Sequence, residues 1–218
     1  MRLIIGRHGK AAHNAAFESY QNGNRAALPG LPGLRQDDAP LVESGIRQAR
    51  AAGAYLVEQD LVPEVVYVSP TVRTHRTWTE YGLAHLTAIP EPRLKEQDGG
   101  SFDRLPLAAT HEQRRAYTLE ALRNPDARPP GGESIREHLQ RVAVWLSEVM
   151  ERHPTSTVLA VTHYGSIGLL GMLCEGLGVE QYLTNRPQHL TPGCGDLIGY
   201  SRRNGRWRRV FVFDNPYH

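Results

Sequence analysis

Four short segments of the sequence carry side chains that could act together on a phosphate ester. The first is Arg7-His8-Gly9, which follows the apolar run Leu3–Ile5. The others are Ser69–Arg73, Leu94–Glu96 and Val161–Gly165. A neutral imidazole is available as a nucleophile near pH 7, and its attack on a phosphate ester would give a phosphohistidine intermediate. The pattern therefore indicates phosphoryl transfer through a histidine nucleophile.

Two arginines and a second histidine could neutralise the phosphate around a His8 nucleophile. The dianionic ester repels an approaching lone pair, and Arg7 and Arg73 could offset its charge through forked, bidentate hydrogen bonds. His163, if protonated, would donate a further hydrogen bond to the transferring oxygens. Gly9 would let the backbone approach the phosphate closely. These residues form the candidate phosphate-binding set.

The leaving alkoxide needs a proton, and two glutamates are candidates to supply it. Glu96 could act first as the general acid and later as the base that activates water. Glu133, which lies just before a predicted helix, is the competing carboxylate. The residues alone leave the choice between these two carboxylates open.

Each of these residues also has a simpler interpretation. An Arg-His-Gly triplet often occurs by chance, Arg73 could be a surface helix residue, and Glu96 could be a solvated carboxylate. A metal site built from His8 and His163 is a further alternative. We disfavour it because adjacent arginines would repel a cation, and no Asp or Glu adjoins either histidine in the sequence. We therefore expect neither a metal ion nor another cofactor.

Composition restricts the class of protein. The chain has 218 residues, of which 40% are hydrophobic and 22% charged, and its formal net charge is +2. These values are typical of a globular protein and point to neither nucleic acid nor a membrane surface as a partner. No apolar run is long enough for a membrane span, and the apolar part of the N-terminus is too short for a secretion signal. Two cysteines without metal-ligand spacing favour a cytoplasmic protein.

Alternating strand and helix patterns predict an α/β fold of three layers, α/β/α, with a mainly parallel sheet. Short apolar runs predict strands at Arg2–Gly6, Val65–Ser69, Thr157–Thr162, Leu197–Tyr200 and Val210–Phe213. The last two flank an Asn-Gly pair, so they should form an antiparallel C-terminal hairpin.

Helical spacing of apolar residues predicts helices between these strands. One begins after Glu43, a second spans Ile135–Val149 and opens with the capping box Ser134-x-x-Glu137, and a third runs from about Ser166 to Cys174. Ligands of such sheets bind beyond the carboxyl ends of the strands. The candidate site residues follow three of the predicted strands, so we expect them to converge there.

We expect a single domain over residues 1–218 that contains two longer excursions. One is a Gly- and Pro-rich loop at about 21–40, and the other is a polar, partly helical segment at about 97–130. The second is a candidate substrate cap.

Together, these segments resemble the histidine phosphatase superfamily, also called phosphoglycerate mutase-like. The first block reads Arg-His-Gly with Asn14 where the family has Arg-His-Gly-x-x-x-x-Asn, and Ser69–Thr77 is similar to its Ser-Pro-x-x-Arg-x-x-x-Thr segment. In chain order, the blocks that carry the resemblance occupy residues 7–14, 40–49, 69–77, 94–96, 131–134 and 161–165. Blocks in this order are specific, whereas any single one is not.

The resemblance implies a phosphoglycerate mutase-like fold and a phosphohistidine mechanism without a metal. It implies the roles given above for His8 and Glu96, and it adds Asn14 to the phosphate-binding set. Lys10 and Arg76 depart from the family pattern. These two extra cations could favour a substrate with further negative charge, or they could point to solvent or pair with Asp98 and Asp103.

The leading prediction is a metal-independent phosphatase acting on a small phosphomonoester, as a monomer or a homodimer. The alternatives are a phosphoglycerate mutase that uses the same pocket, and a phosphoryl-binding protein without turnover. The resemblance implies longer central insertions and a C-terminal tail in mutases, whereas this sequence stops soon after its last hairpin. That difference favours hydrolysis.

Overall fold

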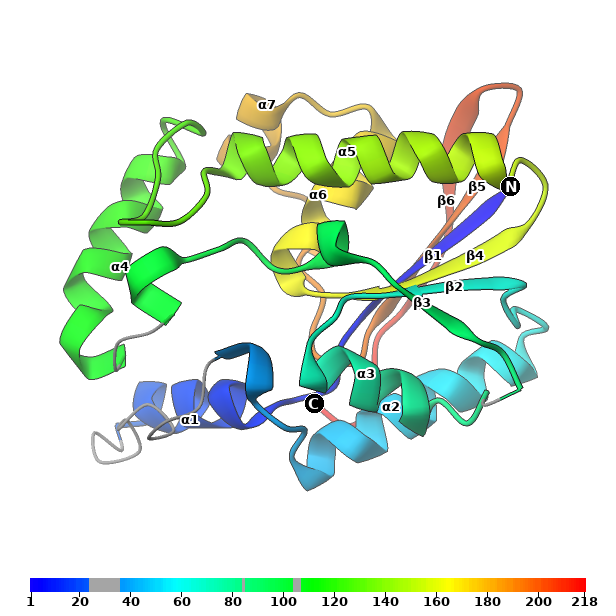
Figure 1. The fold of residues 1–218 in the computed structure, drawn as a ribbon, viewed down its shortest axis with the longest axis horizontal. Helices are drawn as coiled ribbons and strands as arrows, with labels where there is room; N and C mark the ends of the chain where they lie inside the picture. Colours follow the sequence, from blue (N-terminus) through cyan, green and yellow to red (C-terminus); the bar gives the residue numbers. More distant parts are fainter. Residues whose placement is uncertain (24–35, 84, 104–106) are drawn as a thin grey trace.

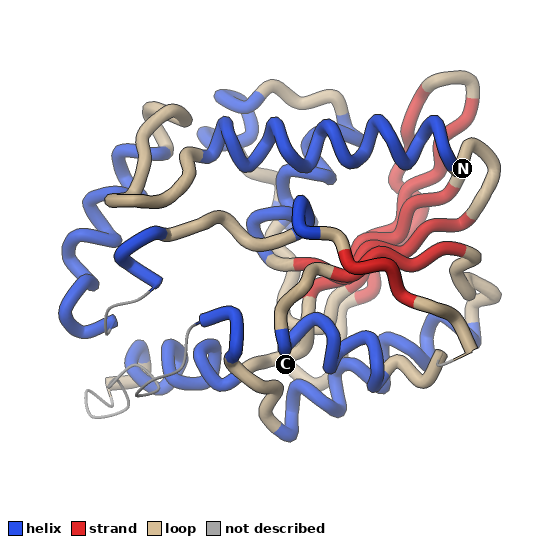
Figure 2. The backbone as a smooth tube through the Cα atoms, in the orientation of Figure 1, coloured by secondary structure: helices blue, strands red, loops and turns tan. Residues whose placement is uncertain are grey.

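A twisted sheet runs through the middle of the molecule, drawn in red in Figure 2. The structure is a computed structural model that describes residues 1–23, 36–83, 85–103 and 107–218. Within these ranges the six strands are β1 (Arg2–Arg7), β2 (Val65–Val68), β3 (Ala88–Pro90), β4 (Thr157–Thr162), β5 (Leu197–Arg203) and β6 (Arg206–Phe213).

The strand order across the sheet is β3-β2-β4-β1-β5-β6. The strands β3, β2, β4 and β1 pair in parallel, whereas β5 pairs antiparallel with both β1 and β6. The turn between β5 and β6 has positive φ at Asn204 (50°) and Gly205 (76°), as a two-residue Asn-Gly hairpin turn requires. The predicted hairpin and the mainly parallel sheet are therefore confirmed.

Helices cover both faces of the sheet, as Figure 1 shows. They are α1 (Ala12–Gln21), α2 (Glu43–Glu58), α3 (Val72–Glu80), α4 (Leu107–Ala121), α5 (Ile135–Arg152), α6 (Tyr164–Glu175) and α7 (Val179–Thr184). Along β1, Leu3 and Ile5 pack with α5 and α6, whereas Ile4 packs with α2 and α3. This alternation follows because successive side chains of a strand point to opposite faces. The predicted three-layer α/β/α architecture is confirmed.

The capping box predicted at the start of α5 is present. Ser134 Oγ accepts the backbone NH of Glu137 at 3.2 Å, and the Glu137 carboxylate accepts the backbone NH of Ser134 at 2.9 Å. Short elements escaped the sequence patterns: β3 is a three-residue edge strand with mostly exposed side chains, and α7 is only six residues long. No helix in the described ranges is both long enough and apolar enough to cross a bilayer.

The two predicted excursions differ in what the structure describes. Residues 24–35 of the loop predicted at 21–40 lie outside the described residues, and Gln36–Asp38 form a 3-10 helix. The segment predicted at 97–130 contains a 3-10 helix at Gly100–Asp103 and then α4, which lies at the end of the molecule away from the sheet (Figure 1). Its role as a substrate cap and the single-domain organisation stay predictions.

Candidate active site

The carboxyl ends of the neighbouring strands β1, β4 and β2 carry the first residues of the site. Arg7 ends β1, His163 follows β4, and Ser69 follows β2. The ring centroids of His8 and His163 lie 5.3 Å apart in an edge-to-face arrangement. The fold therefore brings together two imidazoles that are far apart in the chain, as parallel pairing of these strands requires.

His8 is buried, and a hydrogen bond fixes the orientation of its ring. Its Nδ1 lies 2.7 Å from the carbonyl oxygen of Gly9. A carbonyl oxygen only accepts, so Nδ1 carries the proton and donates it, while Nε2 keeps its lone pair. Burial, followed by the charges of Arg73 and Arg7, lowers the pKa of His8 well below its ordinary value. The arrangement thus favours a neutral His8 imidazole whose Nε2 carries the free lone pair that a nucleophile needs.

The backbone that follows His8 is packed too tightly for a side chain at residue 9. The Gly9 NH donates to Oγ1 of Thr77 at 2.9 Å, and a Cβ on Gly9 would come within 2.2 Å of the Gly45 carbonyl oxygen. The Lys10 NH donates to Oε1 of Gln48 at 2.8 Å. These contacts explain why glycines, a threonine and a glutamine occur at these spacings: they lock the loop that holds His8.

Arg73 and His163 form a buried chain of hydrogen bonds with Ser69. Nη2 of Arg73 donates to Nδ1 of His163 at 3.0 Å, and Nε2 of His163 donates to Oγ of Ser69 at 2.7 Å. Arginine has no acceptor, so Nδ1 of His163 is unprotonated. Burial, followed by the charge of Arg73, lowers the pKa of His163 well below its ordinary value. The protonated His163 considered from the sequence is therefore not the form that this arrangement favours.

Arg7 and Asn14 lie together at the β1 side of the site, where both line one hollow. Nη1 of Arg7 donates to the carbonyl oxygen of Pro192 at 2.7 Å. Its Nε is buried and has no hydrogen-bond partner in the described part of the chain. Oδ1 of Asn14 accepts the NH of Ala11 at 3.1 Å, which fixes the start of α1. The Arg7 Nε is thus a buried donor available to an anion.

Glu96 lies against the first turn of α6, the helix that follows His163. Its carboxylate oxygens are 3.2 and 3.1 Å from the backbone nitrogen of Gly165, which donates to them, and Oε1 accepts the NH of Gln97 at 3.0 Å. A side chain at position 165 would displace the Glu96 carboxylate, because a Cβ there would come within 2.4 Å of Oε1. Glu96 and Arg73 line the same cavity of about 230 Å³. The candidate acid and a candidate phosphate ligand therefore face one space.

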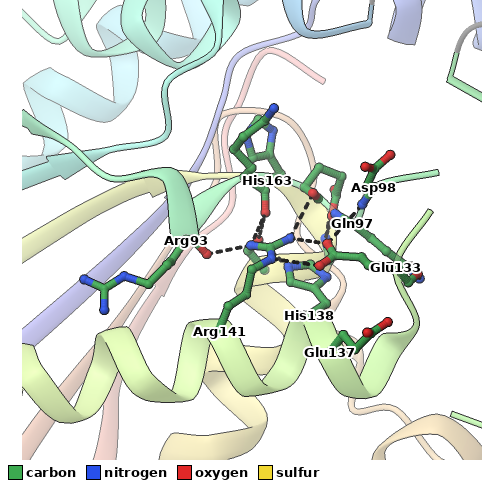
Figure 3. A network of polar contacts seen from close by, with 12 residues as sticks. Arg93, Gln97, Asp98, Glu133, Glu137, His138, Arg141 and His163 are labelled. Atoms are coloured by element: carbon green, nitrogen blue, oxygen red, sulfur yellow. Dashed lines mark hydrogen bonds and ion pairs between the residues drawn. The ribbon is translucent and has the colours of Figure 1, made fainter. Parts of the chain in front are cut away.

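Glu133 is engaged by its neighbours on both carboxylate oxygens (Figure 3). Oε2 accepts from Nε of Arg141 at 3.0 Å, and Oε1 accepts from Nη2 of Arg141 and from the NH of Asp98. Such a bidentate pair fixes the orientation of the carboxylate. Glu133 therefore holds Arg141 in place, and Glu96 is the better candidate for the general acid.

Arg141 of α5 connects Glu133 to the backbone that carries Glu96 (Figure 3). Its Nη1 donates to the carbonyl oxygens of Arg93 at 2.6 Å and Lys95 at 2.8 Å, and Nη2 donates to that of Glu96 at 3.0 Å. One guanidinium thus fixes three carbonyls at and before the candidate acid. Sequence reasoning missed Arg141, which lies outside every motif block and carries no local signal.

Other side chains near the site were also missed or left uncertain. Ser166 and Thr162 donate to the carbonyl oxygens of Lys95 at 2.9 Å and Leu94 at 2.5 Å, so they support the same loop. The ring centroid of His13 lies 6.0 Å from that of His8. Burial lowers the pKa of His13 to about 3, with Arg73 and Arg7 adding to the effect. His13 and Thr162 lie inside motif blocks and Ser166 directly follows one, and this position was the available signal.

Lys10 and Arg76 do not contribute charge as one sequence hypothesis suggested. Lys10 pairs with Glu18 at 2.9 Å and Arg76 with Glu80 at 2.5 Å. Neither pairs with Asp98 or Asp103, which the sequence offered as partners. Lys10 is paired within the α1 region instead, and Arg76 shares the carboxylate of Glu80 with Arg50 of α2.

Curated proteins of two activities are similar to this chain. The 2,3-bisphosphoglycerate-dependent phosphoglycerate mutase of Azorhizobium caulinodans is 32% identical over 195 residues, which cover 82% of this chain and 83% of the relative. Phosphoserine phosphatase 1 of Hydrogenobacter thermophilus is 32% identical over 182 residues, which cover 83% and 78%. Sequence similarity alone therefore does not separate mutase from phosphatase.

Solved structures share the fold over the whole chain. Mycobacterial glucosyl-3-phosphoglycerate phosphatase in complex with inorganic phosphate has a TM-score of 0.75 at 22% identity, covering 100% of this chain and 99% of its own. The α-ribazole phosphatase from Shigella flexneri has a TM-score of 0.73 at 22% identity, covering 100% and 97%. The model of the histidine phosphatase superfamily (branch 1) matches residues 3–211. With a match over nearly its full length, the chain belongs to the histidine phosphatase superfamily.

Proposed function

We propose that the chain is a phosphatase that hydrolyses a small phosphomonoester, without a metal, through a phosphohistidine on His8. One observation carries this proposal. The Nε2 atom of a neutral His8 is left as a nucleophile, and the ring lies beside His163 and within the field of Arg73. An anionic ester that enters there meets a nucleophile and positive charge together.

In the first half-reaction, Nε2 of His8 forms a bond to phosphorus as the ester P–O bond breaks. A protonated Glu96 gives its proton to the leaving alkoxide, so that a neutral alcohol departs. Arg7 and Arg73 bind the phosphoryl oxygens, and fixed donors of this kind stabilise the charge that develops in the transition state.

In the second half-reaction, the ionised Glu96 takes a proton from a water molecule, whose oxygen attacks phosphorus as the P–N bond breaks. Inorganic phosphate leaves, and neutral His8 and protonated Glu96 are restored. Glu96 lines two cavities, which gives water access to the group that must activate it. This access supports hydrolysis over return of the phosphoryl group to a substrate.

A phosphoglycerate mutase is the second candidate, because relatives of that name match this chain at 28% to 32% identity. The same His8 chemistry would serve, but the phosphoryl group would pass back to a hydroxyl of the substrate. A phosphoryl-binding protein without turnover is the third candidate.

A panel of phosphomonoesters, assayed for free phosphate with and without a chelator, tests the proposal. We expect phosphate release that the chelator does not change, and free phosphate rather than isomerised product from 3-phosphoglycerate. His8→Ala should abolish both turnover and the covalent phosphoenzyme. His75→Ala, at an exposed histidine of α3, is the matched control and should retain both.

Each alternative predicts a different result from this panel. Isomerised 3-phosphoglycerate without free phosphate would favour the mutase. Phosphate binding without turnover of any ester would favour the non-catalytic protein, and normal turnover by His8→Ala would refute the nucleophile. Loss of activity with the chelator would contradict the metal-free mechanism.

The cellular location and assembly belong to the same proposal. Cys174 and Cys194 are both unpaired thiols, which supports a reducing, cytoplasmic environment. Whether the enzyme acts as a monomer or a homodimer is measurable by sedimentation equilibrium.

A further inference from the structure

A second cavity adjoins Glu96 on the side of α4 and α7. Its volume is about 320 Å³, and Glu96 and Gly165 form part of its wall. Much of the remaining wall consists of aromatic rings and aliphatic side chains: Phe102, Tyr117, Ile135, Tyr164, Leu169 and Tyr182. Glu96 would protonate the oxygen of the leaving group, so that oxygen must lie near Glu96. If the leaving group occupies this cavity, the rest of it lies against aromatic side chains.

The first cavity, which contains Arg73, is unsuited to an alcohol with its own negative charge. Besides Glu96, its wall carries four carboxylates: Asp37, Asp98, Asp103 and Glu133. Its cations Lys95 and Arg141 already form ion pairs with Asp37 and Glu133. Of these four, Asp98 forms no ion pair among the described residues and lines only the first cavity, whereas Asp103 lines both cavities and lies near Arg114. The charge of Asp98 repels an anion from the first cavity, so the second cavity is the better location for an anionic alcohol.

Arg186 gives the second cavity positive charge that is not neutralised. Its guanidinium lies 4.4 Å from the ring centroid of Tyr182 and 5.6 Å from that of Tyr164, and Nη1 donates to the Tyr164 hydroxyl at 3.2 Å. Among the residues that the structure describes, no carboxylate forms an ion pair with Arg186. Arg114 in the same wall differs, because Asp103 lies 3.9 Å from it.

Tyr164 connects Arg186 to the candidate phosphate site. The guanidinium of Arg7 lies 5.1 Å from the Tyr164 ring centroid, on which Arg186 also packs. The two arginines are therefore neighbours of one tyrosine ring. A small molecule that binds its phosphoryl group near Arg7 can place a second anion near Arg186.

We propose that the alcohol of the substrate carries a flat ring and a second anionic group, and that Arg186 binds this second anion. The inference rests on the proposed function, because it describes the leaving group of that reaction. The ring packs against the tyrosines of the cavity, and the anion, a carboxylate or a second phosphate, receives a forked pair of hydrogen bonds. Because Tyr164 and Tyr182 already orient the guanidinium, little side-chain freedom is lost on binding.

Matched aryl phosphates test the proposal directly. We compare 4-carboxyphenyl phosphate with its uncharged counterpart 4-carbamoylphenyl phosphate, and 1,4-phenylene bisphosphate supplies phosphate as the second anion. For the wild type we expect kcat/KM to be about tenfold higher for an anionic ester than for the carbamoyl ester, the size of one charge-assisted contact. Arg186→Gln should bring this ratio close to one, mainly through KM.

Two further variants keep the test decisive. Arg186→Lys retains the charge but not the fork, so it should keep part of the preference, and it replaces the glutamine variant if that protein does not fold. Arg203→Gln removes the same charge from the exposed β5–β6 hairpin and should leave the preference unchanged. A preference that survives in Arg186→Gln, or that falls equally in Arg203→Gln, overturns the proposal.

Binding of phosphonates separates this inference from the proposed function. Calorimetry with 4-carboxyphenylphosphonate and 4-carbamoylphenylphosphonate needs no turnover. Tighter binding of the carboxylate that depends on Arg186 supports the anion site even if no ester is hydrolysed. Equal binding of both phosphonates, with equal hydrolysis of both esters, overturns the anion site and leaves the phosphatase assignment intact.

Discussion

Two parts of the site are held in place in different ways: the anion-binding cup of His8, Arg73 and His163, and the loop that carries Glu96. In the cup, the supporting contacts join motif blocks to one another, as when Gly9 donates to Thr77. The Glu96 loop also contacts Thr162 and Gly165 of a motif block, but it depends in addition on Arg141, which lies outside those blocks. The groups proposed to bind the phosphate are thus supported within the motifs, whereas the orientation of the proposed acid depends in addition on a distant helix.

This difference predicts two kinds of defect. Damage to the anion-binding cup should slow every phosphoester, because each substrate presents the same phosphoryl group. Damage to Glu96 or its support should slow only esters whose leaving groups need a proton. The dependence of the rate on the leaving group therefore distinguishes the two parts.

The largest effect is expected when the cup is broken at Arg73. Arg73→Lys cannot contact both His163 and a phosphoryl oxygen with one fork, so kcat/KM should fall by about 10²- to 10³-fold. The loss should be equal for alkyl and nitrophenyl phosphates. Arg76→Lys on the same helix, at an exposed residue paired with Glu80, is the control and should retain activity. A loss confined to alkyl esters would show that Arg73 acts on the acid rather than the phosphate.

Removing the acid should give a loss that depends on the leaving group. Glu96→Gln keeps an acceptor for the Gly165 NH but carries no transferable proton, so alkyl phosphates should slow by about 10²- to 10³-fold. Nitrophenyl phosphate, whose leaving group needs no proton, should slow by less than about tenfold. Asp98→Asn changes an exposed carboxylate of the same cavity and should have little effect. Equal losses for both esters would contradict the assignment of Glu96.

Removing the support of the acid should reproduce this pattern more weakly. Arg141→Met removes the hydrogen bonds of the guanidinium to three carbonyl oxygens and to Glu133, so Glu96 should be displaced. A displacement of this kind costs about tenfold to 100-fold for alkyl phosphates. KM should change little, and nitrophenyl phosphate should be nearly unaffected. Arg136→Met is the control, because Arg136 lies on the same helix as Arg141 and forms only surface ion pairs, among them one with Asp126. Uniform loss with all esters would instead indicate general destabilisation.

The sequence was informative where a short range of residues supplies both the element and the contact. Apolar runs located the main strands, and their ends located His8 and His163, because parallel neighbours bring their carboxyl ends together. The Asn-Gly pair located the hairpin. Arg141 and Arg186 could not be found this way, since each acts through partners from other elements. The choice between Glu96 and Glu133 also needed the structure, because it depends on the partner of Glu133.

The smallest expected effect is on the pH dependence of the free energy of unfolding, to which buried histidines of both parts of the site contribute. Burial is the main cause that lowers the pKa values of three histidines. His8 and His163 belong to the cup, and His138 donates to Ser166 beside the Glu96 loop. In the unfolded chain these histidines titrate near pH 6.5. Below that pH the unfolded state binds more protons, so the free energy of unfolding falls as the pH falls. The stabilisation is complete above about pH 6.5, and each histidine contributes a slope of up to about 1.4 kcal/mol per pH unit below it.

Sulfate, an analogue of phosphate that stays a dianion between pH 7 and 5, should change only the part of this slope that comes from the cup. A bound dianion favours protonated His8 and His163, so it raises their pKa values and brings the proton uptake of the folded state closer to that of the unfolded state. Denaturant unfolding between pH 7 and 5 should therefore show a shallower slope with sulfate than without it. His138→Gln, which can still donate to Ser166, should reduce the slope by a similar amount with and without sulfate. If saturating sulfate leaves the wild-type slope unchanged, the two buried imidazoles do not face the anion, and the distinction between the cup and the acid's support fails.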